Sequence, residues 1–286
     1  MRKFCIFAND MEYTLNCNGH LLDLSTPQVM GILNATPDSF YAASRTQTER
    51  EIANRAEEIL KQGGTIIDVG ACSTRPDSKT ATEAEEEERL RLALKTIRIV
   101  TPDTIVSVDT FRPQLARMAV EEYGVSIVND VGAPVNSPEV TIDSQKDMFR
   151  MVSRLRVPYI YMSRKSNTKD ILIDSAEVVD TLRSMGQKDI IIDPGFGFGK
   201  NVEQNYEVMS GLERLQMLRL PILVALSRKS MIYRLLQSTQ EEALTGTIAL
   251  NTIALMKGAD ILRVHDVKEA VDCVKIVKSL EIKDKR

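Results

Sequence analysis

MGILNATPDSF, at residues 30–40, is an apolar run that stops at a carboxamide, Asn34, and continues into a polar loop containing proline. The same succession recurs along the chain: short apolar runs rich in β-branched residues end on polar side chains that are costly to bury. These ends are Asn34, Asp109, Asn129, Asp193, Lys229 and His265. If the runs are parallel strands, their ends converge on one rim, where α/β proteins build their sites.

The apolar runs alternate with segments of helical period, which is the pattern of repeated βα units. Expected strands are Val29–Leu33, Thr65–Val69, Thr104–Val108, Ser126–Val128, Pro158–Met162, Asp189–Ile192, Ile222–Leu226 and Asp260–Val264. Expected helices are 48–62, 83–100, 113–122, 145–155, 174–186, 203–218, 241–257 and 267–281. An open doubly wound sheet usually has about five or six strands, so this pattern predicts a (β/α)8 TIM barrel.

Residues 1–25 depart from this alternation. Phe4–Ala8 and Tyr13–Asn16, followed by Asn18-Gly19, predict a short N-terminal β-hairpin that closes the barrel bottom. Barrels of about 250 residues are commonly single domains. We therefore expect residues 1–286 to form one α/β barrel domain with the hairpin as its extension.

Local signals mark several helix ends. Thr48 with Glu51, and Thr82 with Glu85, have the spacing of capping boxes at helix starts. Gly258 lies where a left-handed C-terminal cap belongs, as does the glycine pair at 63–64. These positions predict where the helices begin and end.

Composition excludes several functional classes. Hydrophobic residues make up 43% and charged residues 27%, as in ordinary globular proteins. A net charge of −3 gives no general attraction to nucleic acid or anionic lipid, and no apolar run is long enough for a signal peptide or a membrane span. The cysteines are scattered without CxxC spacing, which indicates neither zinc nor disulfides. We expect a cytoplasmic protein without nucleic-acid or membrane partners.

The stretch DPGFGFGK at residues 193–200 surrounds two aromatic residues with three glycines. It lacks the spacing of a phosphate-binding P-loop, because Pro194 stands where the first glycine belongs. A carboxylate beside an exposed ring suits a flat heterocycle, since Asp193 accepts N–H bonds while the ring stacks. The alternative is a glycine-rich turn with core phenylalanines.

Cationic side chains follow the last two expected strands, in SRKS at residues 227–230 and RVHD at 263–266. Strand alternation makes Arg263 and His265 point the same way, so an anion is expected there. The hydroxyl-rich loop STRP at residues 73–76 also suits oxyanions. Asp68 and Asp130 also follow apolar runs, and either a site role or structural capping fits them.

In chain order, these stretches resemble the dihydropteroate synthase family from about residue 12 onward. The carriers of the resemblance are residues 30–40, 73–76, 107–110, 129–130, 193–200, 226–230 and 263–266. The resemblance implies a pterin-binding (β/α)8 enzyme that joins 6-hydroxymethyl-7,8-dihydropterin diphosphate to p-aminobenzoate, giving 7,8-dihydropteroate and diphosphate, with Mg²⁺ present. It also implies a homodimer and competition by sulfonamides.

The resemblance assigns residues to each substrate. Pterin-binding residues are Asp109, Asn129, Met162, Asp193 and Lys229, and diphosphate-binding residues are Asn34, Thr74, Arg263 and His265, with Asn34 also at the metal. Residues for p-aminobenzoate are Phe40, Thr74, Arg75, Pro76, Phe198 and Ser230. The catalytic roles fall on Asp109, Lys229, Arg263 and His265.

The chain departs from the family pattern in its first loop, where residues 41–44 read YAAS instead of the usual Ser-Asp-Gly-Gly. This departure keeps a non-catalytic or regulatory pterin-binding paralogue as an alternative. A methyltetrahydrofolate:corrinoid methyltransferase is the other alternative, although such an enzyme has no diphosphate to hold.

Overall fold

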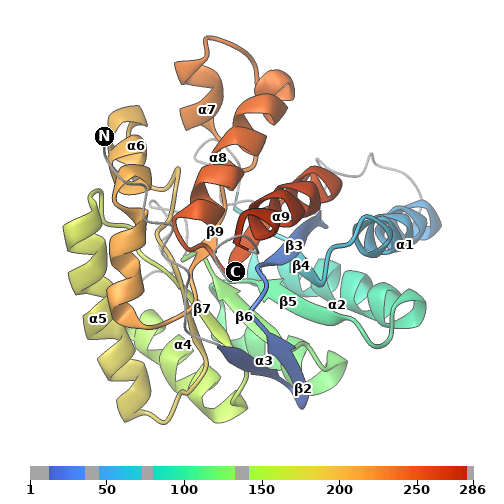
Figure 1. The fold of residues 1–286 in the computed structure, drawn as a ribbon. Coiled ribbons are helices and arrows are strands. Elements are labelled where there is room, and N and C mark those ends of the chain that lie inside the picture. The colour runs from blue at the N-terminus through green and yellow to red at the C-terminus, as the bar shows by residue number, and fades with distance from the viewer. Residues whose placement is uncertain (1–12, 36–44, 73–79, 133–141, 282–286) are drawn as a thin grey trace, which may run out of the picture.

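The computed structural model describes residues 13–35, 45–72, 80–132 and 142–281, and within them parallel strands form a barrel surrounded by helices (Figure 1). The barrel strands are β3 (Gln28–Asn34), β4 (Ile66–Gly70), β5 (Ile105–Asp109), β6 (Ile127–Asp130), β7 (Tyr159–Met162), β8 (Ile190–Asp193), β9 (Leu223–Val224) and β10 (Ile261–Val264). They are hydrogen-bonded in the order β8-β7-β6-β5-β4-β3-β10-β9. A parallel bridge between Ile192 and Ile222 joins the two remaining edges. The predicted (β/α)8 barrel is confirmed.

The helices cover the outside of the barrel. They are α1 (Arg45–Lys61), α2 (Glu83–Val100), α3 (Pro113–Tyr123), α4 (Ile142–Leu155), α5 (Thr168–Ser184), α6 (Val202–Ser210), α7 (Ser230–Leu235), α8 (Leu244–Met256) and α9 (Val267–Glu281), with 3-10 helices η1 (Leu212–Leu218) and η2 (Glu241–Ala243). None of the described helices has the length and apolarity needed to cross a bilayer.

Several helices differ from expectation. The segment expected at 203–218 divides at Gly211 into α6 and η1. A Cβ at Gly211 would lie 2.7 Å from Thr168 Oγ1, so only glycine fits there without displacing Thr168. Helix α5 begins at Thr168, earlier than expected, because Asn167 caps it by accepting from Asp170 N. The short α7 was not expected from the sequence pattern.

The predicted caps are mostly confirmed. Thr82 and Glu85 form a reciprocal capping box at the start of α2. Gly63 and Gly258 follow α1 and α8 with φ of +94° and +88°, which is the left-handed backbone of a helix end. The prediction for Thr48 was wrong, because α1 already begins at Arg45 and Thr48 lies inside it.

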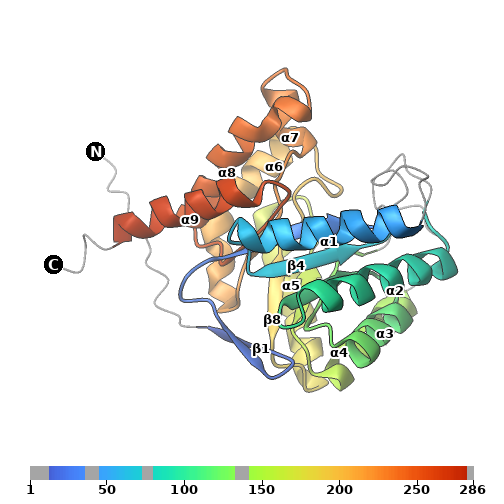
Figure 2. The same cartoon turned by 90° about the vertical axis from the view of Figure 1, so that its right-hand side faces the viewer.

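An antiparallel hairpin closes one end of the barrel. Its strands are β1 (Thr14–Cys17) and β2 (His20–Asp23), which turn at Asn18-Gly19 as predicted. Phe4–Ala8, expected in the same hairpin, lies outside the described residues. In Figure 2 the hairpin and α7 lie at opposite ends of the molecule.

Apolar side chains of the hairpin pack into the barrel interior. Leu15, Cys17, Leu22 and Leu24 are buried in one cluster with inward-facing residues near the strand starts. The barrel members of this cluster are Met30, Ile66, Ile127, Ile160, Ile191, Leu223, Ala225 and Ile261. The hairpin therefore seals the barrel bottom, and the open end is the carboxyl rim.

Candidate active site at the carboxyl rim

Polar residues occupy the inward positions two residues beyond the apolar bottom layer. Alternation along a strand places them on the same inner face as the residue two positions earlier. The pairs of bottom and next inward residue are Ile66 and Asp68, Ile127 and Asn129, Ile191 and Asp193, and Ile261 and Arg263. The polar strand ends seen in the sequence therefore line the open half of one barrel.

A charged cluster connects four of these strands. Arg263 Nε donates to Asp68 Oδ2 at 2.6 Å, and Arg263 Nη2 donates to Asp109 Oδ2 at 2.5 Å. Asn129 Nδ2 donates to the same Asp68 Oδ2 at 3.2 Å. Asp68 and Asn129 are fully buried, whereas the side chains of Arg263 and Asp109 are 14% and 16% exposed. Solvent therefore reaches the cluster through Arg263 and Asp109.

Burial sets the protonation of this cluster. It raises the pKa of Asp109 to about 7, against the lowering effect of the Arg263 guanidinium. Burial alone would lower the pKa of Arg263, but Asp68 and Asp109 together raise it above its ordinary value. Arg263 therefore stays charged, while Asp109 gains or loses a proton near neutral pH.

A second group of polar residues lies at the ends of β8 and β9. Asp193 is almost fully buried, and its Oδ1 accepts from Gly195 N at 2.7 Å. Lys229 Nζ donates to the Phe196 carbonyl and lies 4.7 Å from the centre of the Phe198 ring. Burial raises the pKa of Asp193, which Lys229 opposes, and burial lowers the pKa of Lys229 to about 8. An acid and a base thus have pKa values shifted toward neutrality.

The glycine-rich segment 193–200 is a tightly held loop. Lys200 Nζ donates to the carbonyls of Gly195 and Phe198 at 2.8 and 3.3 Å. Gly195 has φ of +68°, and a Cβ there would overlap the Ser163 carbonyl oxygen. Phe196 is fully buried in the core, as expected for a glycine-rich turn with core phenylalanines. Phe198 is only half-buried, as expected for a ring that stacks on a ligand.

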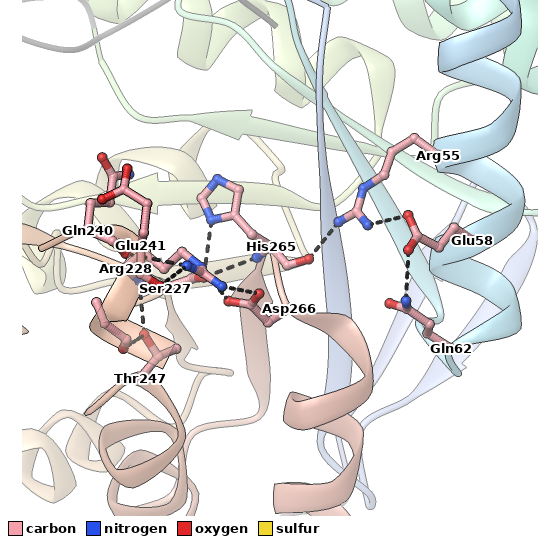
Figure 3. Close-up of polar contacts among 11 residues, drawn as sticks. Arg55, Glu58, Gln62, Ser227, Arg228, Gln240, Glu241, Thr247, His265 and Asp266 are labelled. Carbon is pink, nitrogen blue, oxygen red and sulfur yellow. Dashed lines mark hydrogen bonds and ion pairs between the residues drawn. The ribbon is translucent and has the colours of Figure 1, made fainter. Parts of the chain in front are cut away.

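The ends of β9 and β10 are joined by the contacts in Figure 3. Arg228 holds Asp266 through two bonds of 2.9 Å, and its backbone N donates to Thr247 Oγ1 at 3.0 Å. His265 Nδ1 lies 3.1 Å from Ser227 Oγ, and its carbonyl accepts from Arg55 at 2.6 Å. The segment between the two strand ends is therefore fixed from both sides.

His265 is not a cation in this environment. Burial, together with the nearby Arg263 charge, lowers its pKa to about 4. The sequence pattern suggests a cluster of cationic or potentially cationic groups here. The imidazole is neutral at neutral pH, so it serves as a hydrogen-bond donor or acceptor.

The structure brings most of the expected site residues to one rim. Asp109, Asn129, Asp193, Lys229, Arg263 and His265 belong to the contacts above, and Met162 is paired in strand register with Asp193. Asn34 ends β3 in register with Gly70, and Ser230 is the first residue of α7. Phe40, Thr74, Arg75 and Pro76 lie outside the described residues.

Asp68 and Lys200 are residues whose place at the rim the sequence did not decide. Asp68 lies at the centre of the charged cluster. Strand alternation could have indicated it, because Asp68 lies on the same inner face of β4 as Ile66 and Gly70. Asp130 is structural, because it accepts from Tyr159 Oη at 2.8 Å and Gly132 N at 2.8 Å. Nothing in the sequence around Lys200, apart from the preceding glycines, indicated that it lies at the rim.

The donor set at the rim fits a lightly held hard cation. Asn34 is exposed at the end of β3 and offers an amide oxygen. Within the four described segments, no three His, Cys, Asp or Glu side chains gather as a metal-binding group. Mg²⁺ commonly takes one or two protein oxygens and completes its shell with water and phosphate.

Comparison with known proteins gives one consistent family. A family model described as pterin binding enzyme matches residues 30–265. The chain is 39% identical over 250 residues to a dihydropteroate synthase of Clostridium beijerinckii, a match that covers 84% of this chain and 89% of that protein. It is 34% identical to the dihydropteroate synthase of Escherichia coli K12, covering 93% and 95% of the two chains.

Solved structures agree with the sequence relatives. A Xanthomonas albilineans dihydropteroate synthase with 4-aminobenzoic acid has a TM-score of 0.85 and 31% identity, covering 95% of this chain and 99% of that chain. The same enzyme with 7,8-dihydropteroate has a TM-score of 0.82 and 30% identity, covering 94% and 99%. A Yersinia pestis dihydropteroate synthase with a sulfonamide has a TM-score of 0.80 and 31% identity, covering 94% and 99%.

Proposed function

The chain belongs to the dihydropteroate synthase family, and we propose that its carboxyl rim joins 6-hydroxymethyl-7,8-dihydropterin diphosphate to p-aminobenzoate. The chain is a transferase of folate biosynthesis. One observation supports this use of the rim above all: Asp193, Asn129 and Asp109 lie with Lys229 and Arg263 at the mouth of one barrel. Acceptors and cations so arranged suit a flat polar heterocycle that carries an anionic leaving group.

Pterin recognition falls to the deeper members of the rim. Asp193 and Asn129 would accept N–H bonds from the pterin edge, and Lys229 would donate to its carbonyl, with Met162 packed beside the ring. Asp193 already holds Gly195 N, so its position is fixed before a ligand arrives. Buried polar groups of this kind reject analogues that leave them without partners.

Diphosphate recognition falls to the mouth of β3 and β10, with Thr74 from the second loop. Arg263 supplies a permanent charge, and neutral His265 supplies a hydrogen bond rather than a second charge. Asn34 would hold Mg²⁺ together with the diphosphate oxygens. When bound, Mg²⁺ neutralises charge on the leaving diphosphate.

The substitution proceeds by departure of the diphosphate before attack. The C–O bond breaks with its electron pair leaving on the diphosphate, and the pterin methylene becomes cationic. Asp109, in its ionised form, stabilises that charge at short range. The aniline nitrogen of p-aminobenzoate then forms the C–N bond and loses a proton, so no covalent enzyme intermediate is needed.

The p-aminobenzoate side is proposed from fewer described residues. Phe198 would stack against its ring and Ser230 would bind its carboxylate, with Phe40, Thr74, Arg75 and Pro76 completing the pocket. The 4-aminobenzoic acid and sulfonamide complexes of related synthases support these ligands as substrate and competitor. Sulfonamides would compete for the same position.

Release of diphosphate tests the proposal. Purified protein is given dihydropterin diphosphate and Mg²⁺, with and without p-aminobenzoate, and both diphosphate and dihydropteroate are measured. We expect release that depends on p-aminobenzoate. Tight pterin binding without such release would contradict the proposal and favour the non-catalytic paralogue. Methyl transfer from methyltetrahydrofolate to a corrinoid would favour the methyltransferase.

We also propose that the protein is cytoplasmic and acts as a homodimer, as the family resemblance implies. Apolar side chains exposed on the neighbouring helices α7, α8 and α9, or directly after α7, support a self-interface: Leu235, Leu236, Ile253, Met256 and Ile276. Sedimentation of the purified chain tests this, and a monomer at micromolar concentration would contradict it.

A further inference from the structure

We infer that Asp68 is a positioning residue that fixes the orientation of Asn129 and Arg263, and so decides which hydrogen-bonding edge the pterin pocket accepts. The inference rests on the proposed pterin site and deepens it. Asp68 lies one layer below the rim on β4, fully buried, and its Oδ2 accepts from both side chains.

The bond from Asn129 determines how its amide is turned. With Nδ2 donated to Asp68, Oδ1 is the atom left for a ligand. Among the described residues, Asn129 Oδ1 is buried and has no hydrogen-bond partner. Buried polar atoms in folded proteins almost always have partners, so this acceptor is free to take an N–H donor from a ligand.

The opposite amide orientation is excluded by charge. It would place Asn129 Oδ1 against the Asp68 carboxylate, two acceptors face to face without a proton between them. The same carboxylate oxygen also holds Arg263 Nε at 2.6 Å, which excludes rotation of Asp68 away from the pair. Asp68 therefore sets acceptor polarity at Asn129 through the hydrogen bond between the two side chains.

Asp68 also fixes the plane of the guanidinium. Arg263 donates through Nε to Asp68 and through Nη2 to Asp109, so carboxylates of two adjacent strands hold one side chain. Two bonds at different nitrogens define a planar group more tightly than one. Loss of Asp68 would leave Arg263 pivoting on Asp109 alone.

A purely structural role fits Asp68 poorly. Its side-chain partners within the described segments are two residues of the proposed site, and none is a backbone N–H. Asp130, by contrast, caps Gly132 N and accepts from Tyr159. The two aspartates therefore differ in what they hold, although both follow apolar runs.

The test measures the dissociation constant for dihydropterin diphosphate with Mg²⁺ by calorimetry, without p-aminobenzoate. We expect Asp68→Asn to weaken binding roughly 10- to 100-fold, the range for buried hydrogen bonds to charged groups. Ser107→Ala is the matched control: Ser107 is buried beside Asp68 in strand register, and its Oγ has no hydrogen-bond partner in the described part of the chain. This control should bind as the wild type does.

A swapped pair keeps the inference testable whatever the single variants do to folding. When Asp68→Asn is combined with Asn129→Asp, the amide introduced at position 68 can donate to the new carboxylate and still accept from Arg263. An acceptor then still faces the ligand. We expect the swap to bind at least about 10-fold more tightly than Asn129→Asp alone, where two carboxylates repel.

Two results would overturn the inference: wild-type affinity in Asp68→Asn, or a swapped protein no better than the product of its single effects predicts. Additivity of that kind is what two side chains that do not act on each other give. Diphosphate release by the wild type is measured in parallel. Pterin binding without p-aminobenzoate-dependent release would defeat the synthase proposal and leave the test of Asp68 intact.

Discussion

The two ends of the barrel interior use the same strand geometry for opposite purposes. At the bottom, the inward residues are apolar and pack against the hairpin, as Ile191 does with Leu15. Two residues further along the same strand, Asp193 is buried at the rim with a raised pKa. Each strand therefore contributes to stability at its start and to chemistry at its end. The apolar bottom stabilises the fold, whereas burial of polar groups at the rim lowers the free energy of unfolding.

The largest expected effect is on ligand binding at the rim. Asp193→Ala should weaken pterin binding by about 3–6 kcal/mol, because at least two bonds to a charged group are lost. Asp189→Ala is the matched control, since Asp189 lies at the bottom end of β8 and accepts from Asn16 N at 3.1 Å. Titration calorimetry measures both. Equal losses in the two variants would remove the distinction between the ends.

The next effect is on stability at the bottom. Leu15→Ala should lower the free energy of unfolding by about 2–5 kcal/mol, because Leu15 of the hairpin is fully buried in the barrel bottom and its truncation leaves a cavity. Turnover measured well below the unfolding temperature should be unchanged. Leu21→Ala, on the same hairpin but 75% exposed, should change stability by less than about 0.5 kcal/mol. Urea denaturation distinguishes the two variants. Loss of turnover in a folded Leu15→Ala protein would contradict the separation of a stabilising bottom from a functional rim.

A pair of glycines sharpens the comparison further. Gly195 at the rim and Gly186 near the bottom of β8 both have positive φ, +68° and +90°. Gly186→Ala adds only backbone strain, about 1 kcal/mol, because nothing lies within 4 Å of its Cβ. Gly195→Ala also overlaps the Ser163 carbonyl, so it should displace the loop and weaken pterin binding as well as stability. Unchanged pterin affinity in a folded Gly195→Ala protein would contradict this.

The last expected effect is a pH dependence. The pKa of His265 is lowered to about 4 in the folded chain. In the unfolded chain its pKa is about 6.5, so the unfolded chain binds the proton first as pH falls. Its contribution to stability is present above pH 6.5 and is lost toward pH 4, by at most about 1.4 kcal/mol per pKa unit. His265→Gln should therefore lose less stability than the wild type across this window.

The control for that measurement is His20→Gln, since His20 is exposed in the hairpin and is the other of the two histidines. Asp109 acts with the opposite sign, because its raised pKa of about 7 makes the folded chain bind the proton more tightly. Both proteins retain Asp109, so its contribution largely cancels. Thermal melts at pH 4.5, 5.5 and 6.5 give the difference, and parallel curves for His265→Gln and wild type would contradict the assignment.

Much of the fold was predictable because hydrophobic period is a local property. Strand positions, the barrel and the capping box at Thr82 follow from patterns within a few residues. One error fell where a distant contact matters: the helix expected at 203–218 ends at Gly211, where Thr168 of another helix approaches too closely for a side chain. The spacing of Thr48 and Glu51 predicted a helix start at Thr48, whereas α1 begins at Arg45.

Sequence by itself determined which residues reach the rim, since alternation and order along the chain give their direction and family resemblance gives their expected roles. Only the tertiary structure decided their charges and partners. It made His265 neutral, buried Phe196 in the core while leaving Phe198 partly exposed, and placed Asp68 between Asn129 and Arg263. The reason is physical: burial and hydrogen-bond geometry depend on groups contributed by separate strands, and no local pattern records how far apart those groups lie.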